Sequence, residues 1–390
     1  MASFLFMCVY CIKLTPISKI NRDLRETSIH IRYTCSMEEQ VATLLLVIIM
    51  LLVPIFRRAY FLPRAEGEEI TQTTRDSFID LIRGFAIIGV VIIHVIYFFY
   101  VSFPYNDPYL LNLTNGFMRF AIPFFFITSG LLLKPPAYSA NGICLFYWHK
   151  FIKLGVPYLL MMLGLLWYAD LSLREFFFQT IQGTGMVPYY FIIVLFQFYL
   201  IYPIIYLWRN SRIFLYVSFV ISLIAYITPA FAQVGEAFTF LPFLFFFVYG
   251  LYYRPLFLDD SKRVLRQNVP VWILLSILFF IPILIKPVIY FNTRFIWGIA
   301  AFNLLFAYKD SLLRLPQYLR QFFIQNGKAS LWIFLTHFPI TFIVFDIFQK
   351  NVDGYYLQFI LSVLLALPAS FVAGYVFQTT YNFLSTKIFK

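Results

Sequence analysis

Long apolar runs recur along the chain, separated by short segments that carry most of the charges. Each run is long enough, or nearly so, to cross the hydrocarbon core of a bilayer as a helix. Lipid offers backbone amides and carbonyls no partner, so each crossing segment must pair them internally, as a helix does. The alternating pattern of a membrane β-barrel does not occur. We therefore predict an all-α, polytopic transmembrane bundle, with runs near 41–56, 78–101, 117–133, 151–170, 188–208, 213–232, 236–253, 269–285, 288–308, 329–349 and 356–378.

Composition agrees with this prediction and changes how the net charge is interpreted. Of the 390 residues, 61% are hydrophobic and 12% are charged, too few charges to cover a soluble domain of this size. A formal net charge of +12 would suggest a nucleic-acid partner in a soluble protein. Here the basic residues lie between apolar runs, where they orient helices and meet anionic headgroups. We therefore expect membrane lipids, and no nucleic acid, as partners.

Basic residues favour every second connection between the core runs, and this pattern predicts an orientation. If the run that begins near Phe78 enters from the cytoplasm, the outer connections hold only Arg174, Lys286 and Lys350. The inner connections hold most of the other basic residues, as the positive-inside rule requires. We expect ten core helices in an integral, multi-pass protein of the plasma (inner) membrane, with a cytoplasmic C-terminus.

The chain divides into an N-terminal extension at 1–40, a possible extra membrane helix at 41–64 and a core at 76–390. The extension is basic, and it would lie outside, against the positive-inside rule, if 41–56 crossed the membrane. Two interpretations stay open: Met37 is the true start of the chain, or 41–56 lies on the inner surface. The core shows no internal repeat and no appended soluble domain, so we expect chemistry within the bundle or at its faces.

Cysteine and histidine are too few and too scattered to suggest a metal centre. The chain has four of each, and Cys8 and Cys11 form a C-x-x-C without the second pair that a zinc site needs. No two histidines stand at a ligand spacing. We therefore expect neither a metal site nor a disulfide framework.

Ionisable residues inside apolar runs are costly and therefore point to function. Asp80, Arg83 and His94 share one run. Eleven residues separate Arg83 from His94, so on a helix they come within about 20° of one face, with His94 about 16 Å deeper. Asp80 lies one turn from Arg83, where an ion pair can hold the guanidinium. Singly, Arg83 fits an interfacial anchor and His94 an interhelical hydrogen bonder. Together on one face, they favour a site.

Other polar residues at depth give weaker signals. Arg294 lies within its run and is expected to line the same interior. Arg119 stands near the outer end of its run, where we expect it to reach the headgroups. His337 either contacts substrate or is a structural hydrogen bonder. Ser129-Gly130 indicates either a helix break that brings substrate close to the backbone or a packing contact between helices.

Four motifs, in order along the chain, resemble those of the acyltransferase 3 family of membrane acyltransferases. They are Asp80-Leu-Ile-Arg83-Gly84-Phe-Ala86-Ile87 with His94, Phe124-Phe125-Phe126-Ile-Thr-Ser129-Gly130, Lys150-Phe-Ile-Lys153-Leu-Gly-Val-Pro157, and Ser330-Leu-Trp-Ile-Phe-Leu-Thr-His337. The third motif has lysines where arginine is common in the family, which keeps the charge but loses the bidentate fork. The resemblance extends from residue 76 to about 380, and four motifs in family order make it specific.

The resemblance implies transfer of an acyl group, most often acetyl from cytoplasmic acetyl-CoA, to a hydroxyl of a cell-surface or lipid-linked carbohydrate. On this basis Arg83, Lys150 and Lys153 bind the phosphates of the acyl-CoA donor, and Asp80 orients Arg83. His94 deprotonates the acceptor or carries the acyl group covalently, and both routes stay open. Acyl-CoA is a donor substrate here, so no permanently bound cofactor is expected. The residues expected at the substrate are Ser129, Gly130, Arg294 and His337.

A transporter or flippase of a lipid-linked saccharide is the alternative, because interior charges and aromatic side chains suit a carrier as well. Against it, the chain shows no inverted hydropathy repeat, which many carriers have. A purely structural protein would leave Asp80, Arg83 and His94 unexplained. Nothing in the sequence favours one oligomeric state.

Overall fold

The computed structural model describes residues 53–54, 57, 60–62, 76–103, 109–168, 171–228, 233–234, 237–258, 263–285 and 293–388. The predicted extension at 1–40 lies outside these residues, as does nearly all of 41–64. Tyr60 and Leu62, at the end of that segment, are attached to the core: the Tyr60 hydroxyl donates to the Phe295 carbonyl at 3.0 Å, and the Leu62 carbonyl accepts from the Tyr253 hydroxyl at 3.1 Å.

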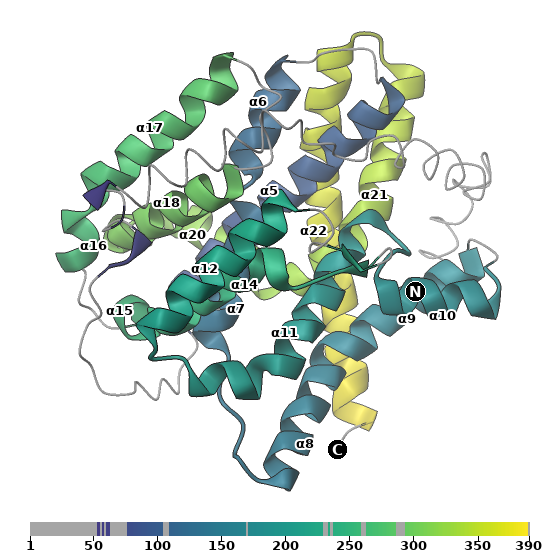
Figure 1. Cartoon of the computed structure of the whole chain (residues 1–390). Helices are drawn as coiled ribbons and strands as arrows, with labels where there is room; N and C mark the ends of the chain where they lie inside the picture. Colours follow the sequence, from purple (N-terminus) through teal and green to yellow (C-terminus); the bar gives the residue numbers. More distant parts are fainter. Residues whose placement is uncertain are drawn as a thin grey trace.

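The described chain is almost entirely helical (Figure 1). Its first half contains α5 (Ser77–Ser102), α6 (Tyr109–Met118), α7 (Ala121–Leu132), α8 (Ala140–Lys150), the π-helix η1 (Phe151–Gly155), α9 (Val156–Tyr168), α10 (Leu173–Gln182), the 3₁₀ turn η2 (Val187–Tyr189), α11 (Tyr190–Leu207) and α12 (Arg212–Ile227). Its second half contains β1 (Gln233–Val234), β2 (Ala237–Phe238), the 3₁₀ turn η3 (Leu241–Phe243), α14 (Leu244–Tyr252), α15 (Arg254–Leu258), α16 (Arg263–Gln267), α17 (Val269–Ile285), α18 (Thr293–Ala307), α19 (Lys309–Leu313), α20 (Gln317–Lys328), α21 (Ser330–Asn351) and α22 (Tyr355–Ile388). The strands β1 and β2 form a short antiparallel hairpin, in which Gln233 pairs with Phe238.

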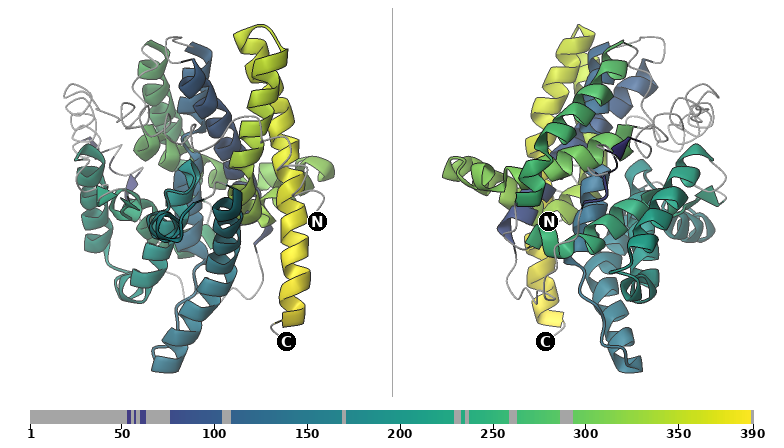
Figure 2. Two further views of the ribbon diagram at one scale, coloured as in Figure 1. Left: turned by 90° about the vertical axis from the view of Figure 1, so that its right-hand side faces the viewer. Right: turned by 60° about the vertical axis from the view of Figure 1, so that its left-hand side comes forward.

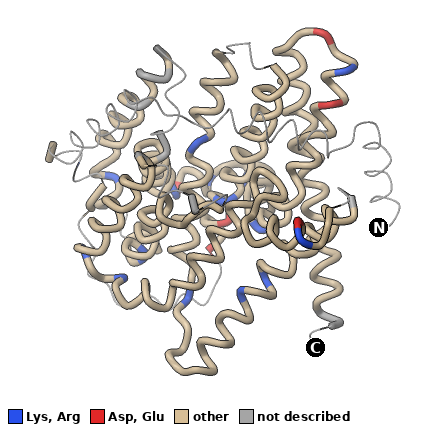
Figure 3. Tube along the Cα trace, turned by 45° about the vertical axis from the view of Figure 1, so that its right-hand side comes forward, with Lys and Arg blue, Asp and Glu red and all other residues tan. Residues whose placement is uncertain are grey.

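The predicted all-α membrane bundle is confirmed. Within the described residues, six helical segments are long and apolar enough to cross a membrane: Ser77–Ser102, Tyr109–Leu132, Ala140–Trp167, Val187–Leu207, Ser330–Asn351 and Tyr355–Ser385. Four shorter apolar helices add to them: Arg212–Tyr226, Leu241–Tyr252, Val269–Leu278 and Phe295–Ala307. Each of the ten predicted core runs therefore contains a helix. Charged residues are sparse along these helices, as a lipid environment requires (Figure 3).

The helix α5 lies at the centre of the bundle, because α6, α7, α20, α21 and α22 all pack against it. The helices α21 and α22 form a long antiparallel pair beside it (Figure 1). On the opposite side of the molecule from the α21–α22 turn, α8 and the C-terminal end of α22 project beyond the other helices (Figure 2). The contacts of α5 therefore decide where the polar residues of that helix point.

The first turns of α5 are fixed by a cap and by a close crossing with α20. Asp76 is the N-cap of α5: its side chain accepts a hydrogen bond from the Phe78 amide at 2.8 Å. The same carboxylate forms an ion pair with Lys309 at 3.5 Å. At the crossing, Gly84 meets the backbone of Phe323, and Gly327 meets the backbone of Asp80. A side chain at either glycine would collide with a carbonyl of the other helix. The two glycines therefore allow the close distance between α5 and α20.

The span that follows α5 is broken in its middle, between α6 and α7. Arg119 and Phe120 form the turn, and the Trp297 indole donates to the Phe117 carbonyl that the break frees, at 2.7 Å. A break at membrane depth is tolerated where neighbouring helices satisfy the backbone in this way. A Cβ on Gly89 of α5 would meet the Ala121 Cβ at 3.2 Å, so the turn lies directly against α5.

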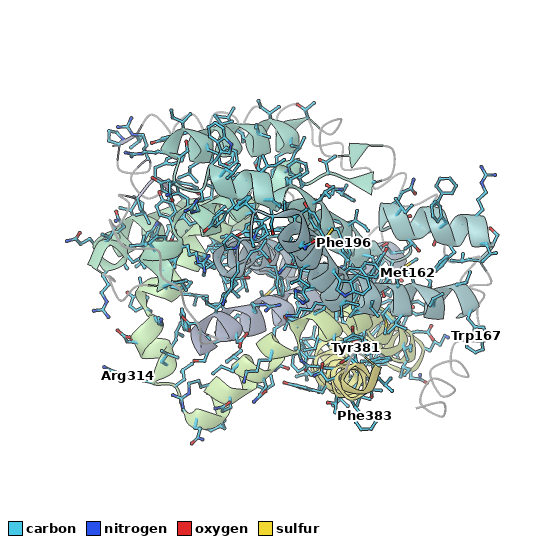
Figure 4. The ribbon with its side chains drawn as sticks, turned by 90° about the horizontal axis from the view of Figure 1, so that it is seen from below. Met162, Trp167, Phe196, Arg314, Tyr381 and Phe383 are labelled. Carbon is cyan, nitrogen blue, oxygen red and sulfur yellow. The ribbon has the colours of Figure 1, made fainter. Side chains whose placement is uncertain are left out.

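The span that contains α8 and α9 is joined by a π-helix rather than by a continuous α-helix. Its five residues, Phe151–Gly155, are held from both sides. The Tyr381 hydroxyl of α22 donates to the Ile152 carbonyl at 2.8 Å, and the Phe196 ring of α11 packs against Gly155. Seen from below, Tyr381 and Phe196 lie on the inner side of the bundle, whereas Phe383 points outward (Figure 4). Such insertions often mark functional segments of helices.

Candidate active site

Two buried histidines, from helices far apart in the sequence, meet in the interior of the bundle. His94 of α5 is 9% exposed, and His337 of α21 is fully buried. The Nε2 atom of His337 lies 3.1 Å from the Nδ1 atom of His94, and the two ring centroids are 4.8 Å apart. We call His94 and His337 the histidine pair. Two polar rings at this depth and distance require a reason to be there.

Backbone carbonyls of their own helices hold both rings. The Nδ1 atom of His94 lies 2.8 Å from the Val90 carbonyl oxygen, and the Nδ1 atom of His337 lies 2.7 Å from the Phe334 carbonyl oxygen. These contacts leave each ring little freedom to rotate. Within the described residues, no hydrogen bond engages the Nε2 atom of His94. That nitrogen is the one available for chemistry.

Aromatic side chains surround the histidine pair. The Phe338 ring stands edge-on to His94 at 5.5 Å, and the Phe334 ring lies 5.6 Å from His337. The buried Tyr189 hydroxyl donates to the Leu335 carbonyl at 2.9 Å and so attaches η2 to the same stretch of α21. The pair is therefore enclosed largely by hydrocarbon, where electrostatic interactions are stronger than in water.

Arg119, at the break between α6 and α7, is also part of this region. It is 7% exposed, so the prediction that it reaches the headgroups is wrong. Gly89 allows the turn that carries Arg119 to lie against α5 near His94. The guanidinium lies close enough for its charge to act on the His94 ring. The structure thus brings a buried cation to the histidine pair, which the sequence had not indicated.

A second cluster, of cationic side chains, gathers around Tyr199 of α11. The Lys150 ammonium lies over the Tyr199 ring at 5.1 Å and over the Phe146 ring at 5.2 Å. The charge of Arg83 acts on the Tyr199 hydroxyl, and the charge of Lys153 acts on Lys150. We call Arg83, Lys150 and Lys153 the cation group. The sequence predicted that these three residues share one end of the bundle. In the structure Arg83 and Lys150 lie near Tyr199, and Lys153 lies near Lys150.

Asp80 lies one turn from Arg83 on α5, as predicted, and is 2% exposed. Its backbone carbonyl faces Gly327 of α20, at the crossing that holds the start of α5. The orienting role of Asp80 toward Arg83 stays a prediction.

Of the two interpretations that the sequence left open for Ser129-Gly130, the helix break does not occur. The helix α7 continues through both residues to Leu132, and the Ser129 hydroxyl donates to the Phe125 carbonyl at 2.7 Å. Gly130 packs against the backbone of Phe247 in α14, and Gly250 of α14 packs in return against the backbone of Ile127. Gly130 is thus a close contact between helices, the alternative that the sequence left open. Contact of Ser129 or Gly130 with substrate stays a prediction.

Arg294 belongs to the first turn of α18, but its side chain lies outside the described residues. Its predicted contact with substrate is therefore not addressed by the structure. In the part of the chain that the structure describes, no three His, Cys, Asp or Glu side chains come together as metal ligands would.

Comparison with known proteins agrees with this arrangement. A family model described as an acyltransferase domain matches residues 76–379, more than three quarters of the chain. The chain belongs to the acyltransferase 3 family. Neither the curated proteins nor the solved structures compared with it contain a match. It is therefore an acyltransferase, and its six long apolar helices make it an integral, multi-pass membrane protein.

Sequence reasoning missed three features of this acyltransferase 3 site: the contact between the two histidines, the burial of Arg119 and the place of Tyr199. Each depends on how distant helices pack, since 243 residues separate His94 from His337. One signal was available for Arg119. It is a charged residue inside an apolar run, the same kind of signal that singled out Arg83 and His94.

Proposed function

We propose that this acyltransferase moves an acetyl group from acetyl-CoA to a hydroxyl of a cell-surface or lipid-linked carbohydrate. The observation that carries the proposal is that one helix, α5, presents a cation of the cation group near one end and a buried imidazole of the histidine pair further along. The first suits an anionic donor and the second suits proton or acyl transfer. Loop charges predict that the Arg83 end of α5 is cytoplasmic, and acetyl-CoA is a cytoplasmic donor.

The cation group supplies the binding site for the donor phosphates. Lys150 and Lys153 lie close enough for their like charges to act on each other, and Arg83 adds a third positive charge near Tyr199. Like charges brought together destabilise the empty site, and a polyphosphate relieves that repulsion while forming charge-assisted hydrogen bonds. The π-helix carries Lys153 and directly follows Lys150, so it sets the relative direction of the two ammonium groups.

The spacing along α5 fits a donor with a long arm. Eleven residues from Arg83 to His94 correspond to about 16 Å of helix. Phosphates held at Arg83 therefore leave the thioester to be carried inward by an extended chain, which the pantetheine arm of CoA provides. On this proposal the arm lies between the helices that face α5.

At the histidine pair, His94 acts on the acceptor or on the thioester. In the base route, His94 takes the proton of the acceptor hydroxyl, whose oxygen forms a bond to the acyl carbon. The carbon–sulfur bond breaks, and the CoA thiolate takes the proton back from His94. In the covalent route, the imidazole nitrogen attacks the acyl carbon first, the carbon–sulfur bond breaks and the CoA thiolate leaves. The acceptor hydroxyl then displaces the imidazole, and its proton passes to the thiolate. In both routes Arg119 stabilises the negative charge that develops on the carbonyl oxygen.

Purified protein in detergent or nanodiscs, with radiolabelled acetyl-CoA, tests the proposal. His94→Ala should abolish transfer of label to a carbohydrate acceptor extract, while expression and membrane insertion stay as in the parent. His149→Ala is the matched control, because His149 is an exposed histidine on α8. Transfer that persists in His94→Ala contradicts the role of His94. A carrier of saccharides would turn over no acetyl-CoA, so absence of turnover in the parent protein contradicts the enzymatic proposal as a whole.

A further inference from the structure

The proton positions in the histidine pair follow from the atoms that each ring contacts. The Val90 and Phe334 carbonyl oxygens accept hydrogen bonds and cannot donate them. The Nδ1 atoms of His94 and His337, at 2.8 and 2.7 Å from these oxygens, must therefore each carry a hydrogen. A neutral imidazole carries one hydrogen, so the Nε2 atom of each ring holds a lone pair.

For two neutral rings, the contact between them agrees with this assignment and with no other. The Nε2 atom of His337, at 3.1 Å, accepts the Nδ1–H of His94, a hydrogen that the Val90 carbonyl also receives in a three-centre bond. If His337 instead donated from Nε2, the Nδ1 atom of His94 would present a lone pair to the Val90 carbonyl oxygen. If both nitrogens of His337 carried hydrogens, its Nε2–H would point at the Nδ1–H of His94. If His94 then lacked the hydrogen on Nδ1, the lone pair of that nitrogen would again face a lone pair of the Val90 carbonyl oxygen.

We infer that His337 is a positioning residue: together with the Val90 carbonyl it accepts the Nδ1–H of His94, which leaves the Nε2 atom of His94 basic, and it shares the positive charge that His94 acquires during transfer. The inference rests on the proposed function, because it assigns the acting nitrogen of His94. In serine hydrolases a carboxylate accepts the same Nδ1–H bond. Here a neutral ring does so, and the resting pair brings no net charge into the membrane interior, where a charge is expensive.

The proposal has a specific consequence for the reaction. The proton of the acceptor hydroxyl moves to Nε2 of His94, the new carbon–oxygen bond forms, the carbon–sulfur bond breaks, and the same proton leaves with the CoA thiol. While Nε2 holds the proton, the Nδ1–H bond to His337 becomes charge-assisted and stronger. No proton has to leave toward His337, so the pair returns to its starting state after each turnover.

Nitrogen NMR of the ¹⁵N-histidine-labelled full-length protein tests the tautomer directly, since protonated and unprotonated ring nitrogens have well-separated shifts. The signals of His94 and His337 are assigned by their loss in His94→Gln and His337→Gln. We expect a protonated Nδ1 and an unprotonated Nε2 at both residues. A protonated Nε2 on neutral His94 overturns the inference, and this measurement on the parent protein does not depend on any variant's activity.

Kinetics with labelled acetyl-CoA test the positioning role. His337→Leu removes the acceptor nitrogen at similar volume, and kcat should fall by about 10- to 100-fold with the KM for acetyl-CoA unchanged. His337→Gln, whose amide oxygen can accept the Nδ1–H, should recover part of the loss. His149→Leu is the control. If His94→Ala is inactive while His337→Leu retains full kcat, the proposed function stands and the positioning role fails. If His94→Ala is active, the role of His94 itself fails.

Discussion

The histidine pair and the cation group, each of which contains one residue of α5, differ in how their side chains are held. In the histidine pair, short side chains are buried, and each Nδ1 atom is fixed by a backbone carbonyl within 2.8 Å. In the cation group, long side chains lie at partly exposed positions, and Lys150 is held by aromatic rings more than 5 Å from its ammonium. Ring and carbonyl contacts of the first kind allow one geometry. The contacts between the Lys150 ammonium and its neighbouring rings allow many geometries.

This difference corresponds to the two tasks that we propose for the clusters. A catalytic base must be positioned to a fraction of an ångström, because misplacement of a reacting group costs rate steeply. A site for phosphates needs charge more than exact geometry, because a lysine acts as a point charge on a flexible stem. We therefore expect changes at the histidine pair to act on kcat and changes at the cation group to act on KM.

After the loss of His94, the largest effect on kcat is expected at Arg119, whose charge acts on the His94 ring. Arg119→Gln should lower kcat by about 10²- to 10³-fold, the cost of removing a group that stabilises a developing oxyanion. The KM for acetyl-CoA should change little. Initial rates with labelled donor give both constants. Arg209→Gln removes a cation that stacks on Tyr206 at 4.2 Å and belongs to neither cluster, and it is the control. An increase in KM at unchanged kcat would indicate that Arg119 binds the donor, and it would contradict a role in stabilising the oxyanion.

A smaller effect, of the opposite kind, is expected at the cation group. Lys150→Gln should raise the KM for acetyl-CoA by about tenfold at unchanged kcat, because one charge-assisted hydrogen bond to phosphate is lost. Lys153→Gln should have a weaker effect, because Lys153 is exposed and better screened. Added salt should raise the KM of the parent more than that of Lys150→Gln. Arg174→Gln, on α10, controls for net charge. A loss confined to kcat would contradict the division of tasks.

The smallest effect on catalysis, but a clear one on assembly, is expected at the α7–α14 contact. A methyl group at Gly130 would meet the Phe247 carbonyl, so Gly130→Ala must push the two helices apart. Gly164→Ala is the matched control: Gly164 is an exposed helical glycine, and a Cβ added there would meet no atom within 4 Å. Thermal unfolding in detergent should show a lower Tm for Gly130→Ala and an unchanged or higher one for Gly164→Ala. Equal Tm values would show that the crossing tolerates expansion.

Much of the fold was predictable, because apolar runs report the membrane directly. All ten core runs contain helices, and α21 lies close to its predicted bounds, whereas α22 extends to Ile388, beyond the predicted end at 378. The break at Arg119-Phe120 was not predicted, because Asn112, Thr114 and Asn115 make α6 more polar than α7 and the apolar run therefore begins near residue 117. What permits the break is the Trp297 indole, 180 residues away, which satisfies the Phe117 carbonyl. Contacts of that kind leave no local trace in a sequence.

The site shows the same limit. The helical spacing of Asp80, Arg83 and His94 could be derived from 3.6 residues per turn, because all three lie on one helix. Which neighbours each would meet could not. His337 stood in a motif with two open roles, and only the packing of α21 on α5 brings its Nε2 atom to His94. Arg119 was assigned to the headgroups because sequence position does not reveal that Gly89 lets its turn approach α5.

The π-helix at Phe151–Gly155 acts as a phase shift in the α8–α9 span. One surplus residue in a helix rotates everything beyond it by about 100° relative to an uninterrupted α-helix. Deleting a single residue from this segment would turn α8 as a rigid rod and swing Lys150 away from Tyr199, with no change in the chain's charge. If the cation group binds the donor as proposed, the number of residues in the π-helix sets the direction in which that site faces.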